Sequence, residues 1–300
     1  MSSQSLQAAA PPIAGRARRL LGDYVELTKP KVQSLLLLTT IATMYVAGDP
    51  SPLLVALTCL GGYLSAGGAG AVNHWFDRDI DARMARTAQR PIPAGRISPR
   101  AALTFGGTLA ALSLLELSLA VNPLAAGLSF AGFLGYVFVY TVWLKRRTPQ
   151  NIVIGGAAGA VPPLVGWAAV RGSVGGLAVI LFFIVFFWTP PHFWALSLLM
   201  KDEYAKVGVP MLPVVRGEAE TRRQILLYSV LLYAVTQLPF CAGGLGPIYL
   251  VASLVLGLGF IAAAVRLYRR ADRRSALRLY LFSLAYLALL FCAMVADVHL

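Results

Sequence analysis

A series of long apolar stretches constrains this chain more than any other feature of its sequence. They begin at Val32 and recur along the whole chain, and each is nearly free of Asp, Glu, Lys and Arg. A helix of about 20 residues, rising about 1.5 Å per residue, crosses the roughly 30 Å hydrocarbon layer of a bilayer. We therefore predict nine transmembrane helices. Their approximate ranges are 32–48, 52–72, 101–120, 124–144, 152–170, 174–199, 224–243, 246–265 and 277–296.

The composition excludes a water-soluble protein. Hydrophobic residues make up 58% of the 300 residues and charged residues only 13%, whereas a soluble domain carries about 25% charged residues. The predicted class is an all-α integral membrane protein. The net charge of +13 does not indicate binding of nucleic acid, because no zinc-ligand cluster or RNA-binding motif accompanies it.

The distribution of Lys and Arg predicts the orientation of these helices. With nine spans, all but Arg171 of the 26 Lys and Arg residues fall on one side of the membrane. Such residues stay on the cytoplasmic side and contact anionic membrane lipid. We expect a cytoplasmic N-terminus, an exported C-terminus and location in the inner membrane. Residues 1–30 are expected to form a cytoplasmic tail without a signal-peptide core, and 31–300 one membrane domain.

A first group of polar residues lies at the cytoplasmic end of the second span. Asn73, Asp77 and Asp81 are spaced by four residues, so on a helix their side chains lie along one face, with Asp79 on another. Oxygen ligands at this density suit Mg²⁺ that also binds phosphate. The alternative is a set of solvated acids paired with nearby arginines. That alternative is weaker, because like charges four residues apart repel without a cation.

A second group lies in the connection between the fourth and fifth spans. Lys145 with Arg146 or Arg147 could neutralise a diphosphate, since arginine offers a bidentate fork and lysine a compact charge. Asn151 is expected to face the same cytoplasmic space. The alternative is a positively charged anchor at the end of a span.

A third group begins within the sixth span. Pro190 and Pro191 are expected to break or kink its helix, and His192 follows them. A histidine inside a span is a candidate functional residue, although it could instead bond a freed carbonyl. The aromatic residues of this span either pack against other helices or enclose an isoprenoid chain. They are Phe182, Phe183, Phe186, Phe187, Trp188, Phe193 and Trp194.

Three longer strings carry a resemblance to a known family. NHWFDRDID, followed by RTAQRPIPAG, resembles the first aspartate-rich motif of the UbiA superfamily of intramembrane prenyltransferases. YTVWLKRRTPQNIVIGGAAGAVPPLVGWAA and FWTPPHFWALSLLMKDEYAKVGVPMLPVV resemble the protoheme IX farnesyltransferase branch. The match runs from about Glu26 to Arg223. It implies nine helices around a central cavity with a cytoplasmic loop cap.

The resemblance also implies the chemistry. Asn73, Asp77 and Asp81 would hold Mg²⁺ on farnesyl diphosphate, and Lys145 and Arg146 would grip the phosphates. Where relatives have a second motif D-x-x-x-D, this chain has Asp202 followed by Glu203, which we take as candidate ligands of a second Mg²⁺. The further substrate-binding candidates are Tyr140, Arg147, Asn151, His192 and Lys206.

The activity that the resemblance implies is transfer of the farnesyl group to a vinyl group of haem b, with addition of water, to give haem O and diphosphate. His192 is expected to line the porphyrin end of the cavity. A haem A synthase or an oxidase assembly factor is the expected partner. The alternatives are a prenyltransferase acting on an aromatic or quinone precursor and, in another class, a transporter whose intramembrane polar residues line a pathway.

Overall fold

The computed structural model describes residues 13–300, and these residues form helices and loops without a strand. Seven long helices are unbroken: α2 (Pro30–Ala47), α3 (Pro52–Phe76), α5 (Pro99–Ala120), α9 (Gly176–Leu199), α12 (Gly217–Cys241), α13 (Pro247–Arg270) and α14 (Arg273–His299). Two further segments are each built from two helices: α6 (Pro123–Leu134) with η1 (Gly135–Leu144), and α7 (Asn151–Gly159) with α8 (Val161–Arg171). The short helices are α1 (Ile13–Leu27), α4 (Arg78–Asp81), α10 (Lys201–Lys206) and α11 (Leu212–Val215).

The predicted all-α membrane class is confirmed. Eight of these nine long segments, within residues 13–300, are long and apolar enough to cross a membrane. The ninth is α2, whose first turns carry Lys31, Gln33 and Ser34 and are therefore less apolar. The chain is thus a multi-pass membrane protein. Within the expected N-terminal tail, residues 13–27 form α1, and residues 1–12 lie outside the described residues.

Local sequence explains where the helices begin. Proline occupies the first turn of α2, α3, α5, α6 and α13, where its missing N–H costs nothing. Ser51, Ser98 and Asn122 then cap three of these helices by accepting a hydrogen bond from a backbone N–H three residues later. The expected break at Pro190 and Pro191 does not occur, because α9 continues through both residues.

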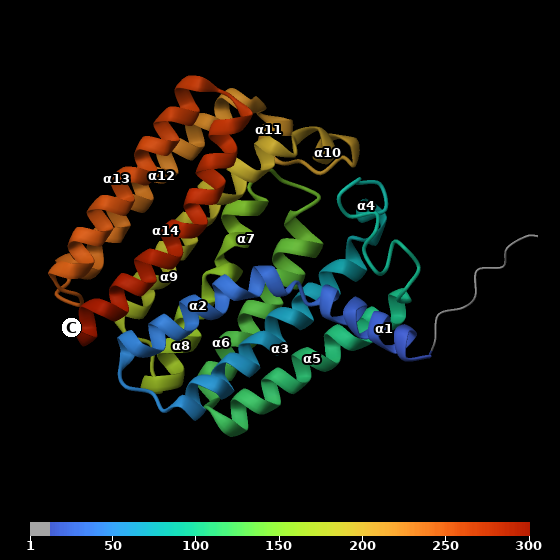
Figure 1. The fold of residues 1–300 in the computed structure, drawn as a ribbon, viewed down its shortest axis with the longest axis horizontal. Coiled ribbons are helices and arrows are strands. Elements are labelled where there is room, and N and C mark those ends of the chain that lie inside the picture. Colours follow the sequence, from blue (N-terminus) through green and yellow to red (C-terminus); the bar gives the residue numbers. More distant parts are fainter. Residues whose placement is uncertain (1–12) are drawn as a thin grey trace, which may run out of the picture.

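The helices form two groups, which are joined by α2 and by the contacts of α7 and α8 with α9 (Figure 1). In one group, α3 packs on α5, α5 on α6, and α6 on α8. In the other, α9, α12, α13 and α14 pack in sequence, and α14 closes on α9. Helix α2 contacts α8 and α3 on one side and α14 on the other. Each group can therefore present a different surface toward α2.

The loops that follow α4 and α10 meet at one end of the bundle (Figure 1). Ile80 and Met84 pack there against Tyr204 and Val207 in one buried cluster. The backbone N–H of Ala85 donates a 2.9 Å hydrogen bond to Glu203 Oε2, which joins the loops again. This arrangement agrees with the expected cap of loops over the helix ends.

The contact between α3 and α5 depends on glycine. A Cβ atom on Gly106 would lie 2.9 Å from the carbonyl oxygen of Gly68 and 2.8 Å from a methyl group of Val72. A Cβ atom on the neighbouring Gly107 would meet nothing within 4 Å. Gly106 is therefore required for the close packing of α3 on α5, and Gly107 is not.

We predict opposite effects for these neighbouring glycines. Gly106→Ala should lower the free energy of unfolding by about 1–3 kcal/mol through overpacking. Gly107→Ala should leave it unchanged or raise it by up to about 1 kcal/mol, because alanine favours helix. Thermal unfolding of both variants in one detergent measures this difference. Equal midpoints would show that the close contact between α3 and α5 is not needed.

Candidate active site

Asn73, Asp77 and Asp81 lie on one buried face, as the spacing predicts. Helix α3 ends at Phe76, but its hydrogen bonding continues: the N–H of Asp77 donates to Asn73 O at 2.9 Å, and the N–H of Asp81 donates to Asp77 O at 2.8 Å. All three side chains are buried, whereas Asp79 is exposed. The chain therefore holds three oxygen-bearing side chains in one row at the end of a transmembrane helix. We call Asn73, Asp77 and Asp81 the acid row.

A different cation contacts each of these three residues. Lys29 donates to Asn73 Oδ1 at 2.5 Å, and Arg90 donates to Asp81 Oδ2 at 2.7 Å. Lys145 pairs with Asp77 Oδ2, which also accepts a 2.7 Å hydrogen bond from Asn73 Nδ2. We call these six residues the polar cluster. Buried carboxylates require such pairing, because a lone buried charge is costly.

Lys29 reaches the polar cluster from the turn between α1 and α2. Its backbone has φ 55°, in the left-handed region, and Pro30 follows it at the start of α2. Burial and the positive charges of Arg90 and Lys145 lower the pKa of Lys29 to about 7. Its ammonium group also donates to the Tyr136 hydroxyl at 3.3 Å.

Lys145 follows directly after the π-helix η1. Its N–H bonds Tyr140 O at 2.9 Å, five residues back, as in a π-helical turn. Within η1, Thr141 accepts a 3.1 Å hydrogen bond from Asn73 Nδ2, which ties η1 to α3. Asn151 is buried at the start of α7 and donates to Lys145 O at 3.4 Å. The segment therefore places Lys145 beside Asp77.

Arg146 and Arg147 have different surroundings. Arg146 binds Asp79 with two hydrogen bonds, of 2.9 and 2.7 Å, and its guanidinium lies over the Phe76 ring at 4.7 Å. These hydrogen bonds lower the pKa of the Asp79 carboxyl. Arg146 Nη2 is 3.6 Å from Asp77 Oδ1, so Arg146 borders the polar cluster. Arg147 is exposed and has no ion pair within residues 13–300.

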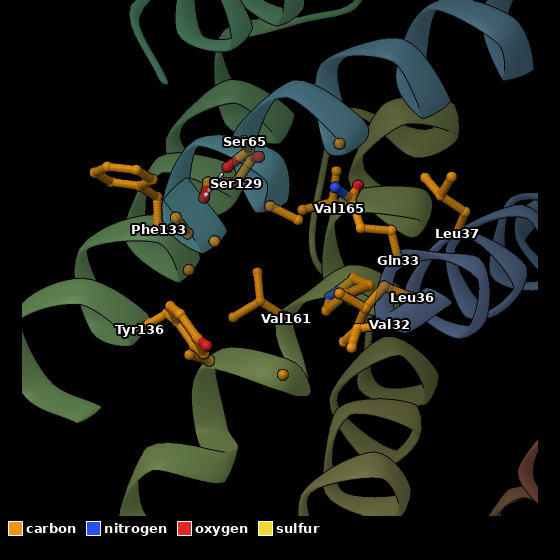
Figure 2. Close-up of a pocket in the computed structure, with 18 of the residues that line it drawn as sticks. Val32, Gln33, Leu36, Leu37, Ser65, Ser129, Phe133, Tyr136, Val161 and Val165 are labelled. Atoms are coloured by element: carbon orange, nitrogen blue, oxygen red, sulfur yellow. Dashed lines mark hydrogen bonds between the residues drawn. The ribbon is translucent and has the colours of Figure 1, made fainter. Parts of the chain in front are cut away.

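A cavity of about 200 Å³ opens beside the polar cluster. Lys29 and Tyr136 line its polar end, and the rest of the wall comes from α2, α3, α6, α7 and α8 (Figure 2). Most of this wall is apolar, including Leu36, Phe133 and Val165. The cavity therefore joins a charged end to an apolar interior.

The aromatic residues of α9 do not line this cavity. Phe182, Phe183, Phe186 and Phe187 contact one another at centroid distances of 5.2–6.3 Å. Phe182, Phe186 and Phe187 also pack against the buried core between the helices, whereas Phe183 is exposed. His192 lies deeper in α9, between Trp188 and Tyr280 of α14.

Asp202 and Glu203 do not lie together with the acid row. Asp202 is exposed, and Glu203 accepts hydrogen bonds from the Ala85 backbone and from Lys206. The Ala85 N–H, and then Lys206, lower the pKa of Glu203. No three His, Cys, Asp or Glu residues group as a metal site within residues 13–300. Glu203 therefore joins the cap loops, and Asp202 has no hydrogen bond or ion pair within residues 13–300.

The acid row nevertheless fits a hard cation. Oxygen atoms from Asn73, Asp77 and Asp81 succeed one another along one face, and Asp77 Oδ1 is buried without a hydrogen-bond partner. Carboxylate and amide oxygens are the ligands that Mg²⁺ prefers, together with phosphate oxygens and water. This donor set is compatible with Mg²⁺ bound between the protein and a diphosphate.

Several residues of the site were not predicted. In the sequence, Lys29 and Arg90 stand out only as cations that set the topology, and no pattern marks Tyr136 or Thr141. The one available signal for Arg90 was its place in the RTAQRPIPAG string. Lys29 is 44 residues from its partner Asn73, so no local spacing links the two.

Comparisons with known proteins agree with this architecture. The family model described as UbiA prenyltransferase family matches residues 36–290. A curated protoheme IX farnesyltransferase of Symbiobacterium thermophilum is 56% identical over 93% of this chain and 95% of its own length. One of Chloroflexus aurantiacus is 56% identical over 93% of this chain, but only 48% of its own length. The chain thus spans about half the length of several curated relatives that it matches.

Solved structures show the same fold. A structure of digeranylgeranylglyceryl phosphate synthase has a TM-score of 0.77 at 21% identity, covering 93% of this chain and 98% of that one. A UbiA homologue from Archaeoglobus fulgidus bound to GPP and Mg²⁺ has a TM-score of 0.68 at 18% identity, covering 91% of this chain and 99% of that one. The fold is that of intramembrane prenyltransferases. The chain belongs to the UbiA prenyltransferase family.

We predict that Lys145 and Arg147 contribute unequally to prenyl diphosphate binding. Lys145→Met removes the cation beside Asp77 and leaves a buried carboxylate unpaired, so affinity for a non-cleavable prenyl diphosphate analogue should fall at least about tenfold. Arg147→Met removes an exposed cation and should change affinity less than about threefold. Titration of both purified variants compares them directly. Equal losses would contradict the geometry of the polar cluster.

Proposed function

We propose that this protein transfers the farnesyl group of farnesyl diphosphate to a vinyl group of haem b, with addition of water, to form haem O and diphosphate. The observation that carries this proposal is the polar cluster at the mouth of an apolar cavity. The names of the close relatives support the two substrates. The chain spans only part of several of those relatives, and the activity is therefore inferred for it from the site.

The polar cluster suits the ionisation of an allylic diphosphate. The bond between farnesyl C1 and the diphosphate oxygen breaks, and negative charge grows on the leaving group. Lys145 and Lys29 supply positive charge there in a buried setting, where electrostatic stabilisation is strong. Arg146 borders the same position. These cations stabilise the transition state more than the bound substrate, because the negative charge on the diphosphate increases as the bond to C1 breaks.

Asn73, Asp77 and Asp81 would hold Mg²⁺, which supplies Lewis-acid stabilisation of the departing diphosphate. Asp202, which is exposed, and Glu203, which accepts the Ala85 N–H, are proposed as weaker ligands of a second ion. The apolar cavity would hold the isoprenoid chain and exclude water. Tyr136 lines the cavity beside Lys29, and Tyr140 packs against Tyr136. We propose that both face the allylic end of that chain.

The farnesyl group is then transferred to the haem. The haem vinyl group gives its electron pair to farnesyl C1, and a new carbon–carbon bond forms. Water adds to the resulting cation next to the porphyrin ring and loses one proton. We assign His192 to the porphyrin end of the site. Asn151 would support the diphosphate site through its hydrogen bond to Lys145 O. Arg147 and Lys206, which are both exposed, are proposed as weaker, outer contacts of the same diphosphate.

The proposed location is the inner membrane, with the polar cluster and the cap on the cytoplasmic side. Farnesyl diphosphate is water-soluble at its head, so a cytoplasmic polar cluster gives it direct access. A haem A synthase or an oxidase assembly factor would accept the product.

We predict that purified protein given haem b, farnesyl diphosphate and Mg²⁺ forms a hydroxyethylfarnesyl haem, detected by chromatography and mass spectrometry. A chelator should abolish the product. Asp77→Asn should lower the rate at least about 100-fold, because it removes a buried charge in the acid row, whereas Asp202→Asn should change it far less.

Other outcomes would redirect the proposal. Diphosphate release with an aromatic acceptor, but none with haem, would keep prenyl transfer and reject haem as the acceptor. Folded protein that is silent with every acceptor would favour a transporter.

A further inference from the structure

His192 is held between two aromatic rings. Its imidazole stacks on Trp188 with a centroid distance of 4.3 Å and an interplanar angle of 18°. On the other face, Tyr280 of α14 lies at 4.9 Å and 28°. Because both faces of the ring are covered, only its edges can meet another molecule. The plane of the ring is thus fixed by helices α9 and α14.

Hydrogen bonding around Ser283 selects the tautomer of this histidine. Ser283 Oγ lies 2.6 Å from His192 Nδ1, and it also donates a 2.6 Å hydrogen bond to Tyr280 O. A serine hydroxyl has one hydrogen, which Tyr280 O receives. The contact with His192 is therefore donated by Nδ1–H and accepted by Ser283. In the neutral ring, Nε2 is then left with its lone pair.

His192 lies on a buried face of α9. On a helix, His192 lies on the same face as Leu181 and Val185, which are 0% and 3% exposed. It lies about 180° from Phe183, by the helical repeat of about 100° per residue, and Phe183 is exposed on the outer surface. Nε2 makes no hydrogen bond, yet it is not among the sealed, unpartnered polar atoms. An accessible nitrogen on an inward face can meet a bound molecule.

Ser283 holds a second residue of α9 as well. Its backbone carbonyl accepts a 2.8 Å hydrogen bond from Trp188 Nε1. Trp188 and His192 are one helical turn apart, and Ser283 is fully buried. One residue of α14 therefore fixes both the ring that stacks on the imidazole and the imidazole itself.

We propose that Ser283 is a positioning residue that presents Nε2 of His192 as a ligand to the iron of the haem substrate. This inference rests on the proposed haem-farnesylating function. A histidine that ligates a metal usually donates its other N–H to a hydrogen-bond acceptor, which fixes the tautomer and strengthens the ligand. Ser283 is that acceptor here. The haem would then lie against α9 and α14, the two helices that hold this imidazole.

Full-length protein in lipid nanodiscs, titrated with ferric protohaem IX, tests this proposal. The wild type should give the absorption spectrum of a histidine-ligated haem, and His192→Ala should lose it. Ser283→Ala should weaken haem binding about 10- to 100-fold and alter the Soret band. Ser283→Ala should not change the KM for farnesyl diphosphate.

Two controls separate positioning from packing. Ser229→Ala also removes a buried helical serine hydroxyl, one that bonds Ile225 O, and it should leave the haem spectrum unchanged. Ser283→Thr keeps the hydroxyl and should restore the wild-type spectrum. Should the threonine variant fail to fold, added imidazole should restore the spectrum of His192→Gly, which tests the same ligand without changing Ser283.

The results distinguish the two proposals. A wild-type spectrum and haem affinity in Ser283→Ala, or in His192→Gly without imidazole, would overturn the inference even if haem O is made. Absence of haem O from wild-type protein that binds haem through His192 would instead overturn the proposed function.

Discussion

The pairing of buried acids with cations from distant segments is the interaction on which this site depends. Asp77 and Asp81 are 1% and 4% exposed, and a carboxylate buried to that extent is stable only with a close positive partner. Lys145 and Arg90 provide those partners from η1 and from the loop after α4, and Lys29 adds a third cation at Asn73. The folding of three loops over one helix end is therefore coupled to the charges that the proposed chemistry uses.

Helix α2 separates the two surfaces that the two proposed substrates need. On one side of it lies the apolar cavity, whose polar end is formed by Lys29 and Tyr136 (Figure 2). On the other side, α2 contacts α14, which carries Ser283 opposite His192. A hydrophobic chain and a flat aromatic ring system differ in shape, so separate surfaces that converge near α2 suit them better than one shared surface.

Much of this organisation could be predicted from the sequence, because each membrane helix appears there as a long apolar stretch. Apolar length located the spans, and four-residue spacing placed Asn73, Asp77 and Asp81 on one face. Contacts between distant segments left no such record: Lys29 meets Asn73 across 44 residues, and His192 meets Ser283 across 91. The prolines of α9 predict a break or a kink by their local preference. The helix does not break, and it packs against α12 and α14.

The central claim is that the polar cluster binds the diphosphate and that the adjoining cavity binds the isoprenoid chain. A structure of the protein with Mg²⁺ and a non-cleavable farnesyl diphosphate analogue tests it most directly. The account predicts density for the diphosphate against Lys29, Lys145 and the acid row, with the chain between α2, α3 and α6. A diphosphate bound away from Asp77, or a chain lying along the α9 aromatic residues, would contradict it.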